Sequence, residues 1–315
     1  MNSRFVLMKV LRALVTIWLV VTAAFFILQL SGDPIEIMLG DDAEPDVVAY
    51  YRSLYGLDQP LYVQYYLYFS GVFHGDLGFS LVDEQAVSAM ILAALPNTLL
   101  LGGVALLLSL AIGIPLGVIA SLNRNTMIDR FTMSFAVFGF SLPNFFLGIL
   151  LIMVFSLWLR WLPSSGMGTI WHLIMPAITL GTSGAGSIAR FTRSAMLEVL
   201  NTPYMRTARA KGLPARLRLK RHAAPNAAIP LVTILGFRLG DLVAGSVVTE
   251  VVFAWPGVGR LLVSAVSSKD LAVVQGILLM VAFTMVLANL LVDLAYGWID
   301  PRIRVTGNAG GEMPR

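Results

Sequence analysis

Residues 97–121 read NTLLLGGVALLLSLAIGIPLGVIAS, a stretch without a single charged side chain. A helix needs about 20 apolar residues to cross the hydrocarbon core of a bilayer, so this stretch predicts a membrane-spanning helix. The whole chain of 315 residues shares this character, with 57% hydrophobic residues, 13% charged residues and a mean hydropathy of +0.79. Such a composition leaves too little polar surface to cover a water-soluble body. The long apolar runs also exclude a β-barrel, whose strands alternate apolar and polar residues.

Six apolar segments are long enough to span a membrane: 11–30, 97–121, 132–158, 171–189, 229–253 and 272–297. The fourth is the weakest because Gly181, Gly184 and Gly186 interrupt it, but the charges on either side require a crossing there. We therefore expect an all-α polytopic membrane protein with six transmembrane helices. Small residues four apart, such as Gly113 and Gly117, predict close helix packing. The chain has no Cys, which excludes disulfides and thiolate metal sites.

Charged residues between the spans predict the orientation. Basic residues precede the first span, follow the last, and lie in the loops around 124–130 and 190–226, whereas region 31–95 holds ten acids and one base, Arg52. Because cytoplasmic loops carry an excess of Lys and Arg, both termini are expected in the cytoplasm. We predict an uncleaved N-terminal anchor helix at 1–30, an external insert at 31–95, a core of five helices at 96–304 and a cytoplasmic tail at 305–315.

The segment 190–226 is too basic to lie in lipid, since nine of its residues are Lys or Arg. Within it stands the pattern Tyr204-Met-Arg-Thr-Ala-Arg-Ala-Lys-Gly212, followed nine residues later by His222-Ala-Ala-Pro225. Gly212 predicts the end of a short helix, and Pro214 keeps that helix from resuming at once. Ala208 and Ala210 would give the helix a small-residue face. Such a helix suits a groove of a partner protein with an acidic rim.

This segment closely resembles the cytoplasmic loop of permease subunits from binding-protein-dependent ABC importers. Gly212 and Pro225 match the family's Gly and final Pro at the family's spacing, while Arg206-Thr-Ala208 stands where most members have Glu-Ala-Ala. His222 replaces an Ile. These departures are typical of the dipeptide, oligopeptide and nickel branch, and the branch resemblance covers nearly the whole chain. It includes the motifs at 55–65, 74–78, 142–144, 161–163, 173–176, 253–260 and 300–302.

The resemblance implies the type I ABC importer permease (MetI-like) fold, with the external insert between helices 1 and 2, in a bacterial inner membrane. It also implies that the loop helix is a coupling helix seated in a cleft of an ATP-binding subunit. The implied ATPase-coupling residues are Tyr204, Arg206, Ala208, Ala210, Gly212 and Leu213. A partner's motion can be transmitted through a rigid helix that is tethered to two spans.

The chain itself contains no G-x-x-x-x-G-K-[ST] P-loop, so we expect neither an enzyme nor a cofactor in it. ATP and Mg would bind to partner subunits. The implied partners are a second homologous permease, two ATP-binding subunits, a soluble substrate-binding protein and membrane lipid, with no nucleic acid. The branch imports dipeptides, longer peptides, glutathione, opines, and nickel or its complexes. The sequence does not distinguish among these cargoes.

Polar residues inside the spans are the candidates for the substrate pathway, because such residues are costly in lipid and should face a partner or a wet path. They are Asn144, Arg238, Asp241 and Glu250. Arg238 and Asp241 lie three residues apart on one helical face and are expected to pair with each other. Glu250, near the external end of its span, is expected to be the better pathway residue.

Two other function classes stay open at this point. Gly181-Thr-Ser-Gly184 resembles the G-x-S-G motif of rhomboid-type intramembrane proteases, with Ser183 as nucleophile. That chemistry needs a His base close to the Ser, and neither His172 nor His222 is well placed for it. The charges within the spans are also compatible with a gradient-driven secondary transporter. No metal site is expected, since the three His residues are not at ligand spacing.

Overall fold

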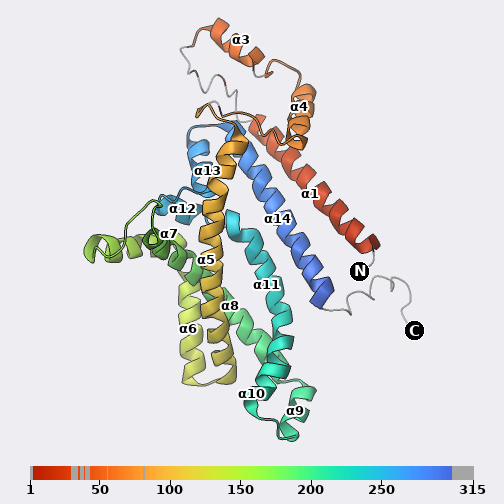
Figure 1. Ribbon diagram of the computed structural model, residues 1–315, viewed down its shortest axis with the longest axis vertical. Coiled ribbons are helices and arrows are strands. Elements are labelled where there is room, and N and C mark those ends of the chain that lie inside the picture. The colour runs from red at the N-terminus through yellow and green to blue at the C-terminus, as the bar shows by residue number, and fades with distance from the viewer. Residues whose placement is uncertain are drawn as a thin grey trace.

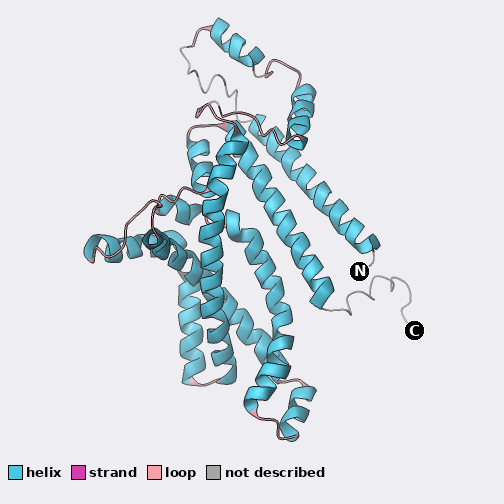
Figure 2. Ribbon diagram, viewed as in Figure 1, coloured by secondary structure: helices cyan, strands magenta, loops and turns pink. Residues whose placement is uncertain are grey.

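The computed structural model describes residues 3–29, 35, 39, 43–54, 56–80 and 82–299. For the helical residues 3–6, 27–29, 233, 237, 241 and 292–299 it describes the backbone alone. The described chain is helical almost throughout, and the β-pairing within it is a single bridge between Phe79 and Ala86 (Figures 1 and 2). These features confirm the predicted all-α class.

Two long helices, α5 (Val87–Leu122) and α8 (Ile170–Leu200), pack closely along their lengths. A Cβ atom added at Gly113 would lie 2.7 Å from the carbonyl oxygen of Ala185, and one at Gly117 would lie 2.5 Å from that of Ala189. Both distances are shorter than a carbon atom can tolerate. The two backbones therefore approach this closely because α5 has no side chain at these positions, as the four-residue spacing of its glycines predicts.

The third predicted span, 132–158, is not one straight helix. It consists of α6 (Met127–Ser141), α7 (Asn144–Leu151) and the π-helix η1 (Ile152–Trp158), with a bend of 95° between the two halves. Pro143 explains the break, because proline has no N–H to continue α6 and forces the preceding residue out of the helical region. Leu142 accordingly has extended dihedrals of −74° and 125°.

The number of membrane crossings remains a prediction. Four helices are long and apolar enough to cross a membrane, and the bent pair makes up to five. The weak fourth predicted span corresponds to α8, which is 31 residues long. It is not one of the four helices that are apolar enough to cross a membrane. It continues eleven residues beyond the predicted end at 189, so the first bases of the segment 190–226 lie on a helix and not in a loop.

Helix α1 (Ser3–Gln29) packs against α14 (Leu271–Ile299) beside the central pair. The start of α1 and the end of α14 point in the same direction, away from α3 (Pro45–Leu54) (Figure 1). The predicted insert contains α3 and α4 (Leu61–Phe73), and Tyr65 of α4 forms a 2.7 Å hydrogen bond with Thr22 of α1. Helix α5 begins at Val87, before the predicted insert boundary at 95.

The fifth predicted span, 229–253, is also interrupted. It comprises α11 (Ala224–Ala244) and the short α12 (Val247–Val252), and a tight turn then leads into α13 (Val258–Ser267). The basic segment before it folds as α9 (Pro203–Ala210), α10 (Ala215–Arg218) and the π-helix η2 (Leu219–Ala223). Helices α9 and α10 lie at the opposite end of the molecule from α3 (Figure 1).

The α5–α8 contact gives a matched pair of substitutions. Gly117→Ala should lower the free energy of unfolding by roughly 1–3 kcal/mol, because the new methyl group pushes the two backbones apart. Gly103→Ala on the same helix meets nothing within 4 Å. It should be neutral or stabilise by up to about 1 kcal/mol, since Ala is the better helix former. Thermal unfolding in detergent would show the difference, and equal midpoints would contradict the packing argument.

Candidate functional site

Helix α9 forms where the sequence supplies both a start and a stop. Pro203 occupies the first helical turn, where a missing N–H costs nothing, and Gly212 follows the end with a φ of +70°. The left-handed glycine lets the chain turn back, so that the Leu213 amide donates to the Ala208 carbonyl at 3.2 Å. No atom lies within 4 Å of where a Gly212 side chain would begin. The predicted helix and its glycine stop are therefore both present.

The inner face of α9 is anchored to the neighbouring helices. Met205 and Ala208 are buried, and Met205 joins a hydrophobic cluster with Met196 of α8 and Ala227 of α11. Leu219 of η2 packs against the same cluster. Because one apolar contact set includes α8, α9 and α11, a force applied to α9 would reach both long helices.

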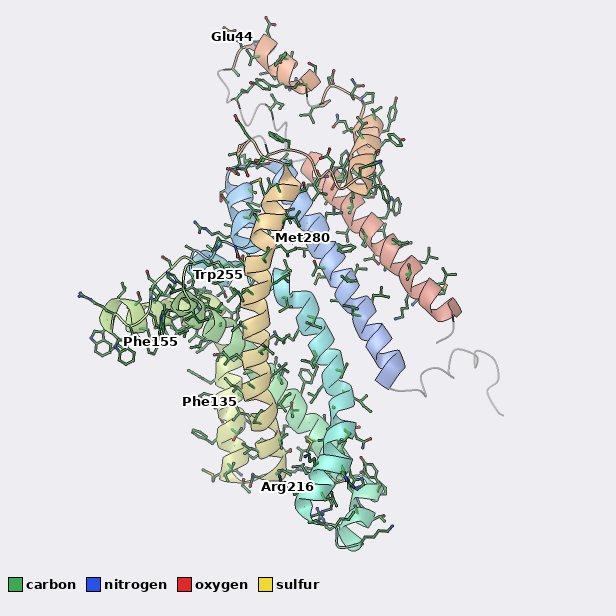
Figure 3. All side chains as sticks on the ribbon, in the orientation of Figure 1. Glu44, Phe135, Phe155, Arg216, Trp255 and Met280 are labelled. Carbon is green, nitrogen blue, oxygen red and sulfur yellow. The ribbon has the colours of Figure 1, made fainter. Side chains whose placement is uncertain are left out.

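The outer face of α9 is polar and exposed. Tyr204, Arg206 and Ala210 are exposed, as is Gly212 after the helix, and Leu213 is half-buried. The expectation that Ala208 and Ala210 share one docking face is wrong, because residues two apart lie on different sides of a helix. Ala208 faces the protein's own core, at 7% exposure. Figure 3 shows Arg216 of the neighbouring α10 at the same end of the molecule.

Two bases counted in the segment 190–226 are engaged within the fold. Arg193 donates from Nε and Nη2 to the two carboxylate oxygens of Asp129, both at 2.7 Å, and so links α8 to the start of α6. The guanidinium of Arg190 lies 5.4 Å from the centre of the Phe140 ring. The Thr126 side chain caps α6 by accepting a hydrogen bond from the Asp129 amide. The sequence could have revealed this cap, because a Thr is followed three residues later by an acid.

A small cavity of about 90 Å³ lies where α5, α7, α8 and α11 meet. Two of the predicted pathway residues, Asn144 and Arg238, line it together with Ser183. The hydroxyls of Ser109 and Ser246 also line it, and glycines and aliphatic residues make up the rest. The Asp241 side chain lies outside the described residues, so its pairing with Arg238 stays a prediction.

Glu250 does not line this cavity, and its role as a pathway residue stays a prediction. Its exposure is 0%, and its carboxyl group accepts hydrogen bonds from the hydroxyls of Thr98 and Ser246, both at 2.8 Å. It also accepts from the backbone amides of Gly259 at 2.7 Å and Arg260 at 3.2 Å. Four donors satisfy the side chain within the protein, so Glu250 holds the first turn of α13 in place.

The turn between α12 and α13 is clamped onto α5 by further contacts. Trp255 is buried, and its indole N–H donates to the Asn97 carbonyl at 2.9 Å, while the Asn97 amide donates to the Pro256 carbonyl at 2.8 Å. The Val258 amide donates to the Thr98 hydroxyl at 2.8 Å. Figure 3 shows Trp255 beside α12, at mid-height in the molecule. We call this network of Asn97, Thr98, Glu250 and Trp255 the α5–α13 clamp.

The geometry does not support a serine protease. Ser183 lies on α8, and His172 stands eleven residues earlier on the same helix, about 16 Å away along the axis at 1.5 Å per residue. The Nδ1 atom of His172 lies 3.0 Å from the Thr169 hydroxyl at the start of α8. His222 is in η2, beyond α9. No described hydrogen bond joins Ser183 to either imidazole.

The α5–α13 clamp predicts that Glu250 matters for stability. Glu250→Ala would leave the buried hydroxyl of Thr98 and the Gly259 amide without their acceptor, which should cost roughly 2–4 kcal/mol. Glu198→Ala removes an exposed carboxylate from α8 and should change stability by less than about 0.5 kcal/mol. Thermal unfolding of the purified chain in detergent measures both. A Glu250→Ala midpoint equal to that of Glu198→Ala would show that the clamp is not structural.

Comparison with known proteins agrees with this architecture. Residues 113–305 match the family of the binding-protein-dependent transport system inner membrane component, and residues 2–102 match its N-terminal part. The chain is 42% identical over 301 residues to the glutathione transport system permease protein GsiC of Escherichia coli O6:H1, covering 95% of this chain and 98% of the relative. GsiC of Salmonella typhimurium is likewise 42% identical over 301 residues, with the same coverage.

Solved structures of similar shape support the fold. The inward-facing MetNI methionine ABC transporter aligns with a TM-score of 0.59 at 21% identity, over 67% of this chain and 96% of that one. An amino acid ABC transporter crystallised with histidines aligns with a TM-score of 0.54 at 15% identity, over 67% of this chain and 94% of that one. The family matches confirm the predicted resemblance, and these structures confirm the predicted MetI-like fold. The chain belongs to the family of binding-protein-dependent transport system inner membrane components and is a permease subunit of an ABC importer.

Proposed function

We propose that this permease forms half of the translocation pathway of an ATP-driven importer for small peptides, with cargo of the size and chemistry of glutathione. The observation that carries the transport role is α9, whose inner face is anchored to two long helices while its outer face is exposed. The cargo class is supported by the glutathione permeases that match this chain over nearly their whole length. No observation favours nickel as the cargo.

Energy would enter through α9 from a separate ATP-binding subunit. Tyr204, Arg206 and Ala210 would contact that subunit, and the exposed bases around them suit an acidic rim on it. Ala208 would act from the inner face by fixing α9 to its own core. Gly212 and Leu213 would set the angle at which the helix is presented. This division assigns docking to one face of α9 and force transmission to the other.

The complete importer would contain a second homologous permease, two ATP-binding subunits and a soluble binding protein that delivers the cargo. ATP and Mg would be bound by the ATP-binding subunits. The exposed basic end with α9 and α10 would face the cytoplasm, as the excess of Lys and Arg there favours. Both termini would lie on that side, and α3 and α4 would lie outside.

Coupling can be tested at Gly212. Gly212→Val should strain the left-handed turn by about 1–2 kcal/mol and reorient α9, because a β-branched residue avoids this conformation. In the assembled complex, stimulation of ATPase activity by the loaded binding protein should fall several-fold while basal hydrolysis remains. Gly166→Val is the matched control, since Gly166 also has a positive φ of +90° and open space around it, but lies between η1 and α8. Equal losses in both variants would count against the assignment.

The orientation can be tested by labelling, because the chain has no natural cysteine to interfere. Lys211→Cys, next to α9, should react with a membrane-impermeant maleimide only in inside-out vesicles. Tyr62→Cys, on an α4 residue that is 76% exposed, should react only in intact spheroplasts. The opposite pattern would place α9 outside the membrane and contradict the proposed coupling to a cytoplasmic ATPase.

A further inference from the structure

The cavity between α5, α7, α8 and α11 is lined by polar side chains that form no hydrogen bond with other described residues. Asn144, Ser183 and Arg238 come from three different helices and all line it. Each is half-buried, and none of the three side chains forms a hydrogen bond or ion pair with another described residue. Three side chains that form no hydrogen bond with the described protein are therefore available to a ligand at one cavity.

The other polar side chains of the same cavity are already satisfied. The Ser109 hydroxyl donates to the Gly181 carbonyl at 2.8 Å, and the Ser246 hydroxyl donates to Glu250 at the same distance. The polar side chains of the cavity thus fall into two sets. Two hydroxyls form hydrogen bonds within the fold, and the other side chains remain available to a ligand. Asn144, Ser183 and Arg238 form the available set.

The charge of the cavity selects the ligand. Arg238 is the one charged side chain among the described residues that line it. An arginine within an apolar span is costly, so it is expected to face a wet pathway or a counter-charge. Its planar guanidinium offers parallel N–H donors that match the two oxygens of a carboxylate. The amide of Asn144 and the hydroxyl of Ser183 can donate to the same group.

The size of the cavity limits what enters it. The cavity has a volume of about 90 Å³. Sites that hold a whole small molecule occupy about 300–1,000 Å³. The cavity can therefore receive one end group of a peptide, such as a carboxylate, while the rest of the cargo extends beyond it.

We propose that Arg238, assisted by Asn144 and Ser183, binds a carboxylate group of the peptide cargo as it passes through the permease. This inference rests on the proposed function and adds a recognition step inside the membrane, beyond the choice made by the soluble binding protein. Asp241 is the competing partner for Arg238, since it lies three residues along α11. A structural pair of these two side chains predicts a different outcome in the experiment below.

The experiment uses the complete importer in proteoliposomes, with glutathione and its two monoamides as cargoes, each amide lacking one carboxylate. ATP-dependent initial uptake is measured for the unmodified importer and for Arg238→Gln, Arg238→Lys and Asn144→Ala. For each cargo, the uptake by a variant is divided by the uptake by the unmodified importer. The binding protein's preference among the cargoes cancels in this ratio. Arg130→Gln is the matched control, because Arg130 is exposed on α6 and lies outside the cavity.

Arg238→Gln should reduce glutathione uptake about tenfold to a hundredfold, the range expected for loss of a charged hydrogen-bonded pair. Uptake of one of the two monoamides should be nearly insensitive to the same change. Arg238→Lys keeps the charge and tests assembly, and its glutathione uptake should lie between those of Arg238→Gln and the unmodified importer. Asn144→Ala should reduce glutathione uptake by a smaller factor. Arg130→Gln should leave the uptake unchanged.

Equal proportional losses for all three cargoes, restored by Asp241→Asn, would show that Arg238 has a structural role and would overturn the inference. The proposed function itself would be contradicted if the unmodified importer showed no ATP-dependent uptake of glutathione or of either amide. In that case the inference falls with it. The two failures are distinguishable because only the first leaves peptide transport by the unmodified importer intact.

Discussion

The close contact between α5 and α8 is the constraint on which the rest of the fold depends. It exists because α5 has glycine at 113 and 117, where any side chain would collide with the α8 backbone. Helix α8 lines the cavity at Ser183 and, thirteen residues later, anchors α9 through Met196. At 1.5 Å per residue these two points are about 20 Å apart on one helix. The cavity and α9 are therefore attached to the same rigid element.

The α5–α13 clamp holds the other side of the cavity. Ser246 lines the cavity and donates to Glu250, whose remaining hydrogen bonds fix α5 through Thr98 and the start of α13. A movement of α12 would break several buried hydrogen bonds together. The cavity wall on this side is consequently stiff, and a change in cavity shape has to come from α7, α8 or α11.

Much of this organisation could be predicted from local sequence. Apolar length predicts most of the long helices, and the pattern around Gly212 predicts α9 and its end. The extension of α8 was missed because Arg190 and Arg193 look like loop charges. Their partners, Phe140 and Asp129, lie 50 and 64 residues away in sequence. Asn144 and Arg238 were predicted as pathway residues and do line one cavity. The hydrogen bonds of Glu250 could not be predicted, because its partners include backbone amides across a turn, which side-chain periodicity does not indicate.

The bend at Pro143 bears on the surrounding lipid. Helix α6 has 15 residues and so extends about 22 Å, against a hydrocarbon core of about 30 Å. The chain turns by 95° before α7 begins, so α7 cannot complete the crossing in the direction of α6. Hydrophobic mismatch of this kind is relieved when the bilayer thins locally or when another subunit covers the short helix. Through the bend at Pro143, the shape of the permease thereby affects the thickness of the surrounding membrane.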